Sequence, residues 1–299
     1  MTTVIWRFSD GRPGHDNQSR GLVGALSRRL PVRSYDLSAA PVLQAAARWL
    51  TQRYPPGDKL PAPDLLIGAG HATHPAMLAA RRRYGGRSVV LMQPSLPNRW
   101  FDLCLVPQHD VPAMRDNVLV TQGVLNAIVR GGGHDPDTGL IIIGGPSRHV
   151  HWNDGSIAGQ VEDLQRRRPV RRWWLTTSPR TPPALAESLR RQLPQLQVMA
   201  YAQAPPGWLP ARLAEAGEVW VSRDSVSMVY EALTSGARVG LLDVPAAGDN
   251  RVAAGIDRLI DNGWVTAPGE THLAPGPPQP LDEAARCADW IVREWLNEN

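Results

Sequence analysis

The chain has 299 residues, of which 42% are hydrophobic and 20% are charged. This length suits two domains of ordinary size, and the composition excludes a wholly disordered, a collagen-like and a coiled-coil protein. The net charge of +4 is mild, and we expect no nucleic-acid partner, since such proteins concentrate their basic residues on one face.

The two cysteines, Cys104 and Cys287, are too few for a disulfide framework or a metal site. Cys104 lies within the apolar run 101–107, which predicts a buried thiol and fits a reducing compartment. The chain shows neither the pattern of a secretory signal nor a run of the roughly 18 to 20 apolar residues that a membrane span needs. We therefore expect a cytoplasmic location, with or without peripheral contact with the inner membrane.

Short apolar runs alternate with longer amphipathic stretches, which is typical of a parallel α/β sheet. In the first part of the chain we expect strands at 4–8, 65–68, 89–92, 103–106 and 118–121, and helices at 18–30 and 75–84. Three consecutive glycines then open the stretch 131–136, which is a candidate linker.

The alternation resumes after this stretch. We expect strands at 139–145, 172–177, 197–201, 218–222 and 239–243, and helices at 157–167, 182–192, 210–216 and 225–235. A Pro- and Gly-rich stretch, 267–280, precedes an amphipathic helix over 281–296. The pattern predicts two α/β domains that face one another across a cleft, residues 1–130 and 131–280, followed by a C-terminal helix, 281–299.

Ligands of open α/β sheets bind beyond the carboxyl ends of the strands, so the loops after strands are the candidate sites. The first loop, 9–18, combines two glycines and a proline before a helix whose amino end would attract an anion. His15 lies in this loop, and a reference pKa near 6.5 suits a general base. The alternative is that the polar residues of this loop only cap the helix.

The second loop, 68–75, contains Gly70 and a His-x-x-His pair, His71 and His74. No Asp, Glu or Cys accompanies the pair at ligand spacing, so we expect contact with a phosphate or a substrate rather than with a metal. The alternative is a plain connecting loop with a solvated histidine.

Two loops in the second half carry Gly, Ser, Thr and Arg after successive strands. Gly144 and Gly145 would let the backbone approach a ligand closely, and Ser147 and Arg148 follow them. The stretch 176–182 adds hydroxyl groups and an arginine before a proline-started helix. Together these residue types predict a phosphate cradle.

The segment 222–232 is the most informative. Its serines are candidate helix caps, and Glu231 follows Ser225 by nearly two helical turns. A carboxylate there would hold a ribose diol while the start of the helix receives phosphates. The alternative is a capped helix with a solvent-facing glutamate.

Several of these motifs together resemble a bacterial family related to the plant mitochondrial fission (elongated-mitochondria) protein. The motifs are SDGRPGHDNQ at 9–18, FDL at 101–103 with VPQHD at 106–110, IGGPS at 143–147, SPRTP at 178–182 and DSVSMVYEA at 224–232. They are spread over about three quarters of the chain. The resemblance implies a GT-B-like fold of two Rossmann-type domains with a sugar-nucleotide cleft.

The segment 222–236 also resembles the donor-binding helix of the peptidoglycan lipid-linked N-acetylglucosamine transferase. That resemblance implies that Glu231 holds the donor ribose and that the loop 11–15 lies beside the acceptor. The loop departs from that enzyme, because arginine and proline stand where the transferase has more glycines. The plant relative, in turn, implies recruitment of a dynamin-like protein rather than catalysis.

The leading hypothesis is a metal-independent glycosyltransferase that moves a sugar from a nucleotide-diphosphate donor to a lipid-linked cell-envelope acceptor. We expect no cofactor and a UDP-type rather than a GDP-type donor, with His15 as the catalytic base and inversion at the anomeric carbon. The alternatives are a non-catalytic recruitment protein on the same scaffold and a sugar-nucleotide epimerase.

The predicted donor-binding residues are Gly144, Gly145, Ser147, Arg148, Ser178, Arg180, Thr181, Asp224, Ser225, Ser227, Met228 and Glu231. The predicted acceptor-binding residues are Asp10, Gly11, Arg12, Gly14, Gln18, Gly70 and His71.

Overall fold

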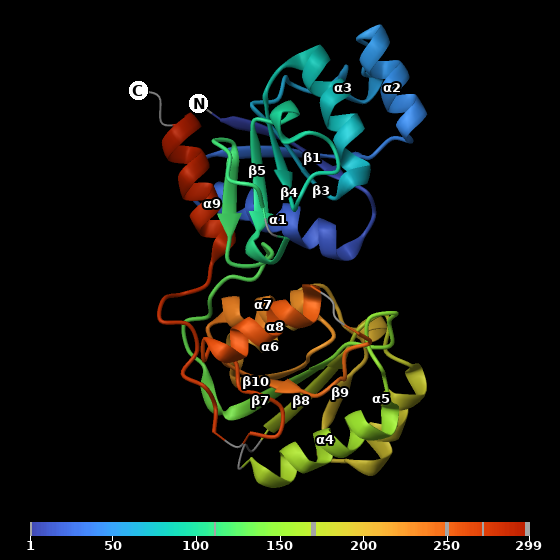
Figure 1. The fold of residues 1–299 in the computed structure, drawn as a ribbon, viewed down its shortest axis with the longest axis vertical. Helices are drawn as coiled ribbons and strands as arrows, with labels where there is room; N and C mark the ends of the chain where they lie inside the picture. The colour runs from blue at the N-terminus through green and yellow to red at the C-terminus, as the bar shows by residue number, and fades with distance from the viewer. Residues whose placement is uncertain (1, 111, 169–171, 249–250, 271, 297–299) are drawn as a thin grey trace. The chain divides into compact units, whose positions relative to one another are not determined.

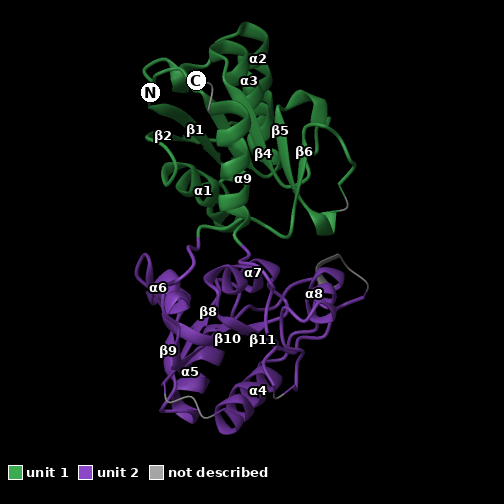
Figure 2. Cartoon of the chain, turned by 90° about the vertical axis from the view of Figure 1, so that its left-hand side faces the viewer, with its two compact units in different colours: residues 1–127, 282–299 green, residues 128–281 purple. Residues whose placement is uncertain are grey.

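The computed structural model describes residues 2–110, 112–168, 172–248, 251–270 and 272–296. The chain forms two compact units, one of residues 1–127 with 282–299 and one of residues 128–281 (Figure 2). The C-terminal helix, which the sequence predicts as a segment of its own, therefore belongs to the first unit.

The first unit is built on a six-stranded parallel sheet in the order β2-β1-β3-β4-β5-β6. The strands are β1 (Thr3–Ser9), β2 (Val32–Ser38), β3 (Leu65–Ala69), β4 (Arg87–Leu91), β5 (Leu103–Pro107) and β6 (Val118–Thr121). The helices are α1 (Pro13–Ser27), α2 (Val42–Thr51), α3 (His74–Tyr84) and α9 (Glu283–Ile291), and α9 continues into a π-helical turn, Val292–Leu296. Neither β2 nor α2 was predicted from the sequence.

The two faces of this sheet follow from the alternation of side chains along each strand. In β1, Ile5 packs on the face covered by α1 and α9, whereas Trp6 and Phe8 pack on the face covered by α3 (Figure 1). α9 contributes Cys287 and Ile291 to the first of these cores. The sheet is thereby buried between two layers of helix.

The second unit is built on a five-stranded sheet of parallel strands in the order β11-β10-β7-β8-β9. The strands are β7 (Asp135–Ile143), β8 (Arg172–Thr177), β9 (Gln197–Met199), β10 (Ala216–Ser222) and β11 (Arg238–Leu242). The helices are α4 (Asp154–Arg167), α5 (Pro183–Gln192), α6 (Trp208–Glu215), α7 (Val226–Ser235) and α8 (Arg251–Asp261). α4 and α5 pack on one face of the sheet (Figure 1). α6 contacts β7 and β10, and α7 contacts β10 and β11. α8, which was not predicted from the sequence, contacts α7.

Two expectations from the sequence are wrong. α1 begins at Pro13 and not near residue 18, because a proline fits the first helical position, so His15 lies in the first turn of the helix. The stretch 131–136 is not a free linker. The imidazole nitrogens of His134 lie 2.8 Å and 3.1 Å from the carbonyl oxygens of Ala216 and Ser235, and β7 already begins at Asp135.

A buried arginine joins β1, β2 and α1. Arg7 donates from Nε and Nη2 to the two carboxylate oxygens of Asp36 at 2.7 Å and 2.6 Å. Its Nη1 donates to Asp16 at 3.0 Å and to Ser19 at 3.1 Å. The hydrogen bonds from Arg7 hold the pKa of the Asp36 carboxyl below its ordinary value. The edge strand β2 and the start of α1 are thereby fixed to β1.

We expect Arg7→Met to lower the free energy of unfolding by about 1–3 kcal/mol at pH 7, since it removes hydrogen bonds to charged groups. The Asp36 contribution to stability is present above the unfolded-state pKa, about 3.9, and is lost as the pH falls through the lower pKa of the folded state. The difference between the wild type and the variant should therefore shrink below pH 4. Urea unfolding at pH 7 and at pH 3 measures it, and a difference that grows on acidification would contradict this reading.

Candidate functional site

In each sheet, successive strands are added first on one side of the first strand and then on the other, so the strand order reverses at one point. In the second unit, β8 and β9 extend the sheet on one side of β7, and β10 and β11 extend it on the other, so the reversal lies between β7 and β10. Ligands of such sheets bind at this point, outside the carboxyl ends of the strands. The loops at that place begin at Gly144 and at Arg223, and the loop after β8 begins at Ser178.

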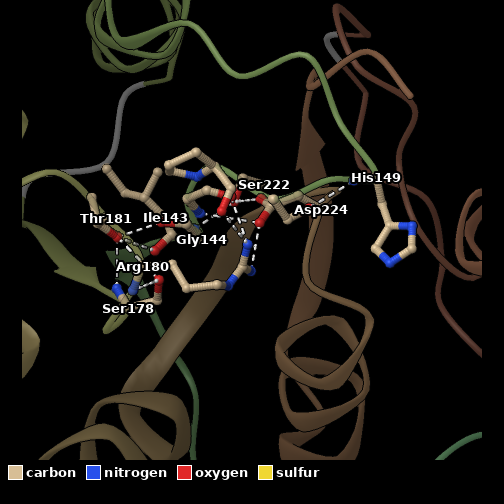
Figure 3. A network of polar contacts seen from close by, with 11 residues as sticks. Ile143, Gly144, His149, Ser178, Arg180, Thr181, Ser222 and Asp224 are labelled. Carbon is tan, nitrogen blue, oxygen red and sulfur yellow. Dashed lines mark hydrogen bonds and ion pairs between the residues drawn. The ribbon is translucent and has the colours of Figure 1, made fainter. Parts of the chain in front are cut away.

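A fully buried carboxylate, Asp224, connects these loops (Figure 3). Its Oδ1 accepts a hydrogen bond from the Ser222 hydroxyl at 2.6 Å, and its Oδ2 accepts from the Gly145 amide at 3.1 Å. Oδ2 also accepts from Nη2 of Arg180 at 2.7 Å. The Ser222 hydroxyl accepts in turn from the Gly144 amide at 2.7 Å. One carboxylate thus joins residues that follow three different strands.

The two glycines after β7 are required by this close approach. A Cβ atom on Gly144 would lie 2.1 Å from Oδ2 of Asp224, and one on Gly145 would lie 2.4 Å from the carbonyl carbon of Arg180. Contacts below 3.0 Å are not found for real Cβ atoms, so any other residue would displace one of the loops. The glycines serve the packing of the loops as well as any approach to a ligand.

The loop after β8 is tied to the same place. The Thr181 hydroxyl donates to the Gly144 carbonyl and accepts from the Ser178 amide at 2.8 Å. Nη1 of Arg180 donates to the Gly145 carbonyl at 2.6 Å. Because the Arg180 guanidinium is also paired with Asp224, its charge is already balanced in this structure. Arg180 therefore acts first as a clamp between loops.

The amino end of α7 follows Asp224 directly. Ser225 occupies the N-cap position, and in the described structure its side chain makes no capping hydrogen bond. Ser227 and Met228 lie in the first turn, and Glu231 lies one turn beyond Ser227 on the same side of the helix, partly buried. The amide groups of this first turn and the helix dipole form a suitable site for an anion.

The structure thus brings six of the predicted donor-binding residues into one network. Next to it, Ser225 is the N-cap of α7 and three more predicted residues lie on the helix. The six are Gly144, Gly145, Ser178, Arg180, Thr181 and Asp224. Ser147 and Arg148 lie in a separate turn, where Ser147 pairs with Val150 and Arg148 donates to the ring of His149. Ser222 is a member of the network that the sequence analysis treated only as a cap, and its signal is a serine at the end of a buried strand.

The first unit carries a second polar cluster at its own reversal point, between β1 and β3. Nδ1 of His15 lies 2.8 Å from Oδ2 of Asp10, and the Asp10 side chain is only 4% exposed. Gly70, which follows β3 with a φ of +83°, lies against the imidazole: a Cβ there would be 2.3 Å from Nδ1. An ionised carboxylate can only accept a hydrogen bond, so this pair places the proton on Nδ1 and makes Nε2 the basic nitrogen.

The other predicted acceptor residues lie around this pair. Gly11 has a φ of +77°, and the Arg12 amide donates to Asp10 at 3.1 Å. Gly14 and Gln18 lie on α1, and Gln18 is buried. His71 is exposed at the start of the turn before α3. These residues all belong to the segments that follow β1 and β3, at the carboxyl ends of those strands.

His74, the second histidine of the His-x-x-His pair, is a core residue. It is buried against Phe101, with ring centroids 5.1 Å apart, and burial lowers its pKa to about 4. Among the residues that the structure describes, no group of three or more His, Cys, Asp or Glu side chains is arranged to hold a metal ion. No helix in the described ranges is long and apolar enough to cross a membrane. Both cysteines are free and buried, as predicted for Cys104.

Comparison with known proteins gives a family and a fold. Residues 13–295 match the sequence profile of the family described as "Mitochondrial fission ELM1". The chain is 29% identical over 117 residues to "Uncharacterized protein RP120" of Rickettsia prowazekii, a match that covers 36% of this chain and 32% of that protein. The chain thus spans about a third of the length of this curated relative.

Solved structures resemble the chain over nearly its whole length. The UDP-GlcNAc 2-epimerase of Methanocaldococcus jannaschii has a TM-score of 0.60 at 11% identity, with 100% of both chains covered. UGT2 of Phytolacca americana, complexed with UDP-2-fluoroglucose and pterostilbene, has a TM-score of 0.51 at 9% identity, with 97% of this chain and 90% of that chain covered. MurG of Acinetobacter baumannii has a TM-score of 0.51 at 15% identity, with 89% and 85% covered. The predicted fold class, two parallel-sheet α/β domains of the GT-B kind, is confirmed.

The contact between Gly144 and Asp224 predicts the effect of one added methyl group. Gly144→Ala should lower the free energy of unfolding by about 1–3 kcal/mol, because the new Cβ overlaps a buried carboxylate. Gly159→Ala is the matched control: Gly159 lies on α4 with nothing within 4 Å of an added Cβ, and alanine there should stabilise by about 0.5–1 kcal/mol. Urea unfolding followed by circular dichroism measures both. Equal effects of the two substitutions would refute the requirement for glycine at 144.

Proposed function

The chain belongs to the mitochondrial fission ELM1 family, and from this premise we propose that it is a glycosyltransferase. It transfers a sugar from a nucleotide-diphosphate donor, of the UDP type, to a lipid-linked acceptor of the cell envelope. The observation that carries this proposal is the network at the reversal point of the second unit. There a buried carboxylate fixes three loops beside the amino end of α7, where the Ser225 side chain makes no capping hydrogen bond in the described structure.

This network supports binding of a nucleotide diphosphate. The amide groups in the first turn of α7, near Ser227 and Met228, would donate to the diphosphate, since a helix amino end combines unpaired donors with positive dipole character. Glu231, one turn further along the helix, would accept hydrogen bonds from the two ribose hydroxyl groups. Gly144 and Gly145 keep the opposite loop free of side chains. The solved structures of similar fold include proteins whose names specify UDP-sugars, which favours the same ligand class here.

The cluster in the first unit supports the chemistry of transfer. Asp10 orients His15 and stabilises the imidazolium that forms when Nε2 removes a proton from an acceptor hydroxyl. That hydroxyl oxygen then bonds to the anomeric carbon as the nucleotide diphosphate leaves with its bonding electron pair. A direct displacement of this kind inverts the anomeric configuration. The helix dipole and amide groups of α7 would stabilise the charge on the departing diphosphate, as preorganised donors do.

Donor binding is tested by thermal denaturation with UDP, GDP, ADP, CMP and their common sugar conjugates. A nucleotide at 100 times its dissociation constant adds about 2.7 kcal/mol, which should raise the melting temperature by about 5–10 °C. Glu231→Ala should weaken the affinity for the active nucleotide about 10- to 100-fold, since it removes hydrogen bonds to a charged group. Glu187→Ala, at an exposed position of α5, is the control and should bind as the wild type does.

The absence of a shift with every nucleotide would refute the donor site and favour the recruitment protein. A shift with GDP rather than UDP would keep the donor site and correct the base.

The role of His15 is tested by separating binding from turnover. His15→Ala should leave the UDP-dependent melting shift unchanged and lower the transfer rate about 10²- to 10⁴-fold, the contribution of a positioned general base. Asp10→Asn should also lower the transfer rate, and it should leave the UDP affinity unchanged. His272→Ala, in the Pro- and Gly-rich stretch, is the control. Transfer that survives His15→Ala would remove the histidine from the mechanism.

The assay also distinguishes an epimerase, the activity for which several solved structures of similar fold are named. An epimerase converts its UDP-sugar without any acceptor, whereas the proposed transferase releases UDP only when an acceptor hydroxyl is present. Incubation of the purified protein with UDP-sugars alone, followed by chromatography of the sugars, therefore decides between the two activities.

A further inference from the structure

The helix α2 is apolar but not buried. It runs from Val42 to Thr51, and Ala45 is its one buried residue. Val42, Leu43 and Leu50 are 65%, 86% and 70% exposed, which are high values for large aliphatic side chains. Figure 1 shows α2 beside α3 in the first unit, and the two helices are in contact. Most of the apolar surface of α2 thus has no partner within the described chain.

This surface forms one wall of a groove of about 620 Å³. Val42, Ala46, Trp49 and Leu50 line it at the spacing of one helical face. α3 contributes Pro75 and Leu78, and the segment 96–100 completes the opposite side, with Trp100 45% exposed. Isolated exposed apolar residues need no explanation, but a continuous groove with two tryptophans on it is typical of an interaction surface.

Arginines lie on and beside the groove. Arg81 and Arg99 line it. Arg99 lies on the groove and is exposed, and the Arg82 guanidinium lies 4.1 Å from the centre of the Trp49 ring. Arg81 is paired with Asp102 at 2.7 Å, so part of the positive charge is structural. The positive charge offered at the surface is therefore that of Arg82 and Arg99.

We propose that this groove and its arginines are the surface by which the protein docks on an anionic phospholipid bilayer. α2 would lie in the plane of the interface with its aliphatic side chains among the acyl chains, as amphipathic helices do. Trp49 and Trp100 would lie at the level of the headgroups, which is the preferred depth of tryptophan. The arginines would contact lipid phosphates. An anionic bilayer offers apolar depth and negative charge at once, whereas a protein partner would have to supply both in one fixed shape.

The docking proposal goes beyond the proposed glycosyl transfer and does not depend on it. It involves only residues of the first unit, and it requires no nucleotide. A protein that binds vesicles but none of the tested nucleotides would refute the transferase and keep the docking surface. A protein that binds a nucleotide but no vesicles would refute the docking surface and keep the donor site.

The test is co-sedimentation of the full chain with vesicles of phosphatidylcholine alone and with vesicles of equal parts phosphatidylcholine and phosphatidylglycerol. We expect binding to the anionic vesicles. We expect it to weaken as salt rises from about 0.1 M to about 1 M, which shortens the Debye length from about 10 Å to about 3 Å.

Two substitutions test the two components of the surface. Leu50→Glu should weaken binding about 10- to 100-fold, since it removes an aliphatic group from the interface. Met114→Glu is its control, because Met114 is 87% exposed in the same unit but does not line the groove. Arg99→Gln should weaken binding about fivefold. Arg20→Gln, on α1 at the other face of the sheet, is its control and should bind as the wild type does.

Leu50 is exposed, so its substitution should leave the fold intact. Equal melting temperatures of the variants and the wild type check this. Binding that does not depend on phosphatidylglycerol, or that Met114→Glu weakens as much as Leu50→Glu does, overturns the proposal. Failure to bind either vesicle also overturns it, and leaves a protein as the occupant of the groove.

Discussion

The geometry of the second unit depends on one buried carboxylate. A carboxylate removed from water is strongly destabilising unless hydrogen-bond donors surround it. Asp224 takes its donors from Ser222 at the end of β10, from Gly145 after β7 and from Arg180 after β8. These donors converge only when the three strands are already side by side in the sheet. The loops that Asp224 connects are therefore held by the same assembly that forms the core, and a ligand there would meet a largely preformed surface.

The first unit repeats this arrangement with different residues. Asp10 follows β1, and its buried carboxylate faces His15, while Gly70 after β3 leaves space for the imidazole. In both units a carboxylate and a glycine lie at the point where the sheet reverses its direction of growth. The difference is the partner of the carboxylate. Arg180 is a permanent cation that holds loops together, whereas His15 is an imidazole with one ring nitrogen turned to the carboxylate and a second ring nitrogen left for other contacts.

Much of this architecture is predictable from the sequence. Strands buried on both faces, such as β3 and β7, appear as continuous apolar runs with loops that contain glycine. The edge strand β2 has mostly exposed side chains and no such run, and α2 is a short helix with a single buried residue, so both were missed. The contact of Arg180 with Asp224, 44 residues apart, was also beyond prediction, because it depends on the strand order. The residue types of the site can be recognised from short stretches of sequence, but which residues pair with one another cannot.

The position of α9 affects how the chain acquires its structure during synthesis. Residues 128–281 form one unbroken stretch that can complete its sheet and helices as soon as it leaves the ribosome. The first unit, although its sheet is made earlier, lacks Cys287, Ala288 and Ile291 of its core until the last helix has been translated. The half of the protein that is translated first is therefore the half that is finished last. In that interval the part of the sheet face that α9 covers is available to chaperones, and a nascent chain that stalls before residue 283 keeps that part exposed beside α1.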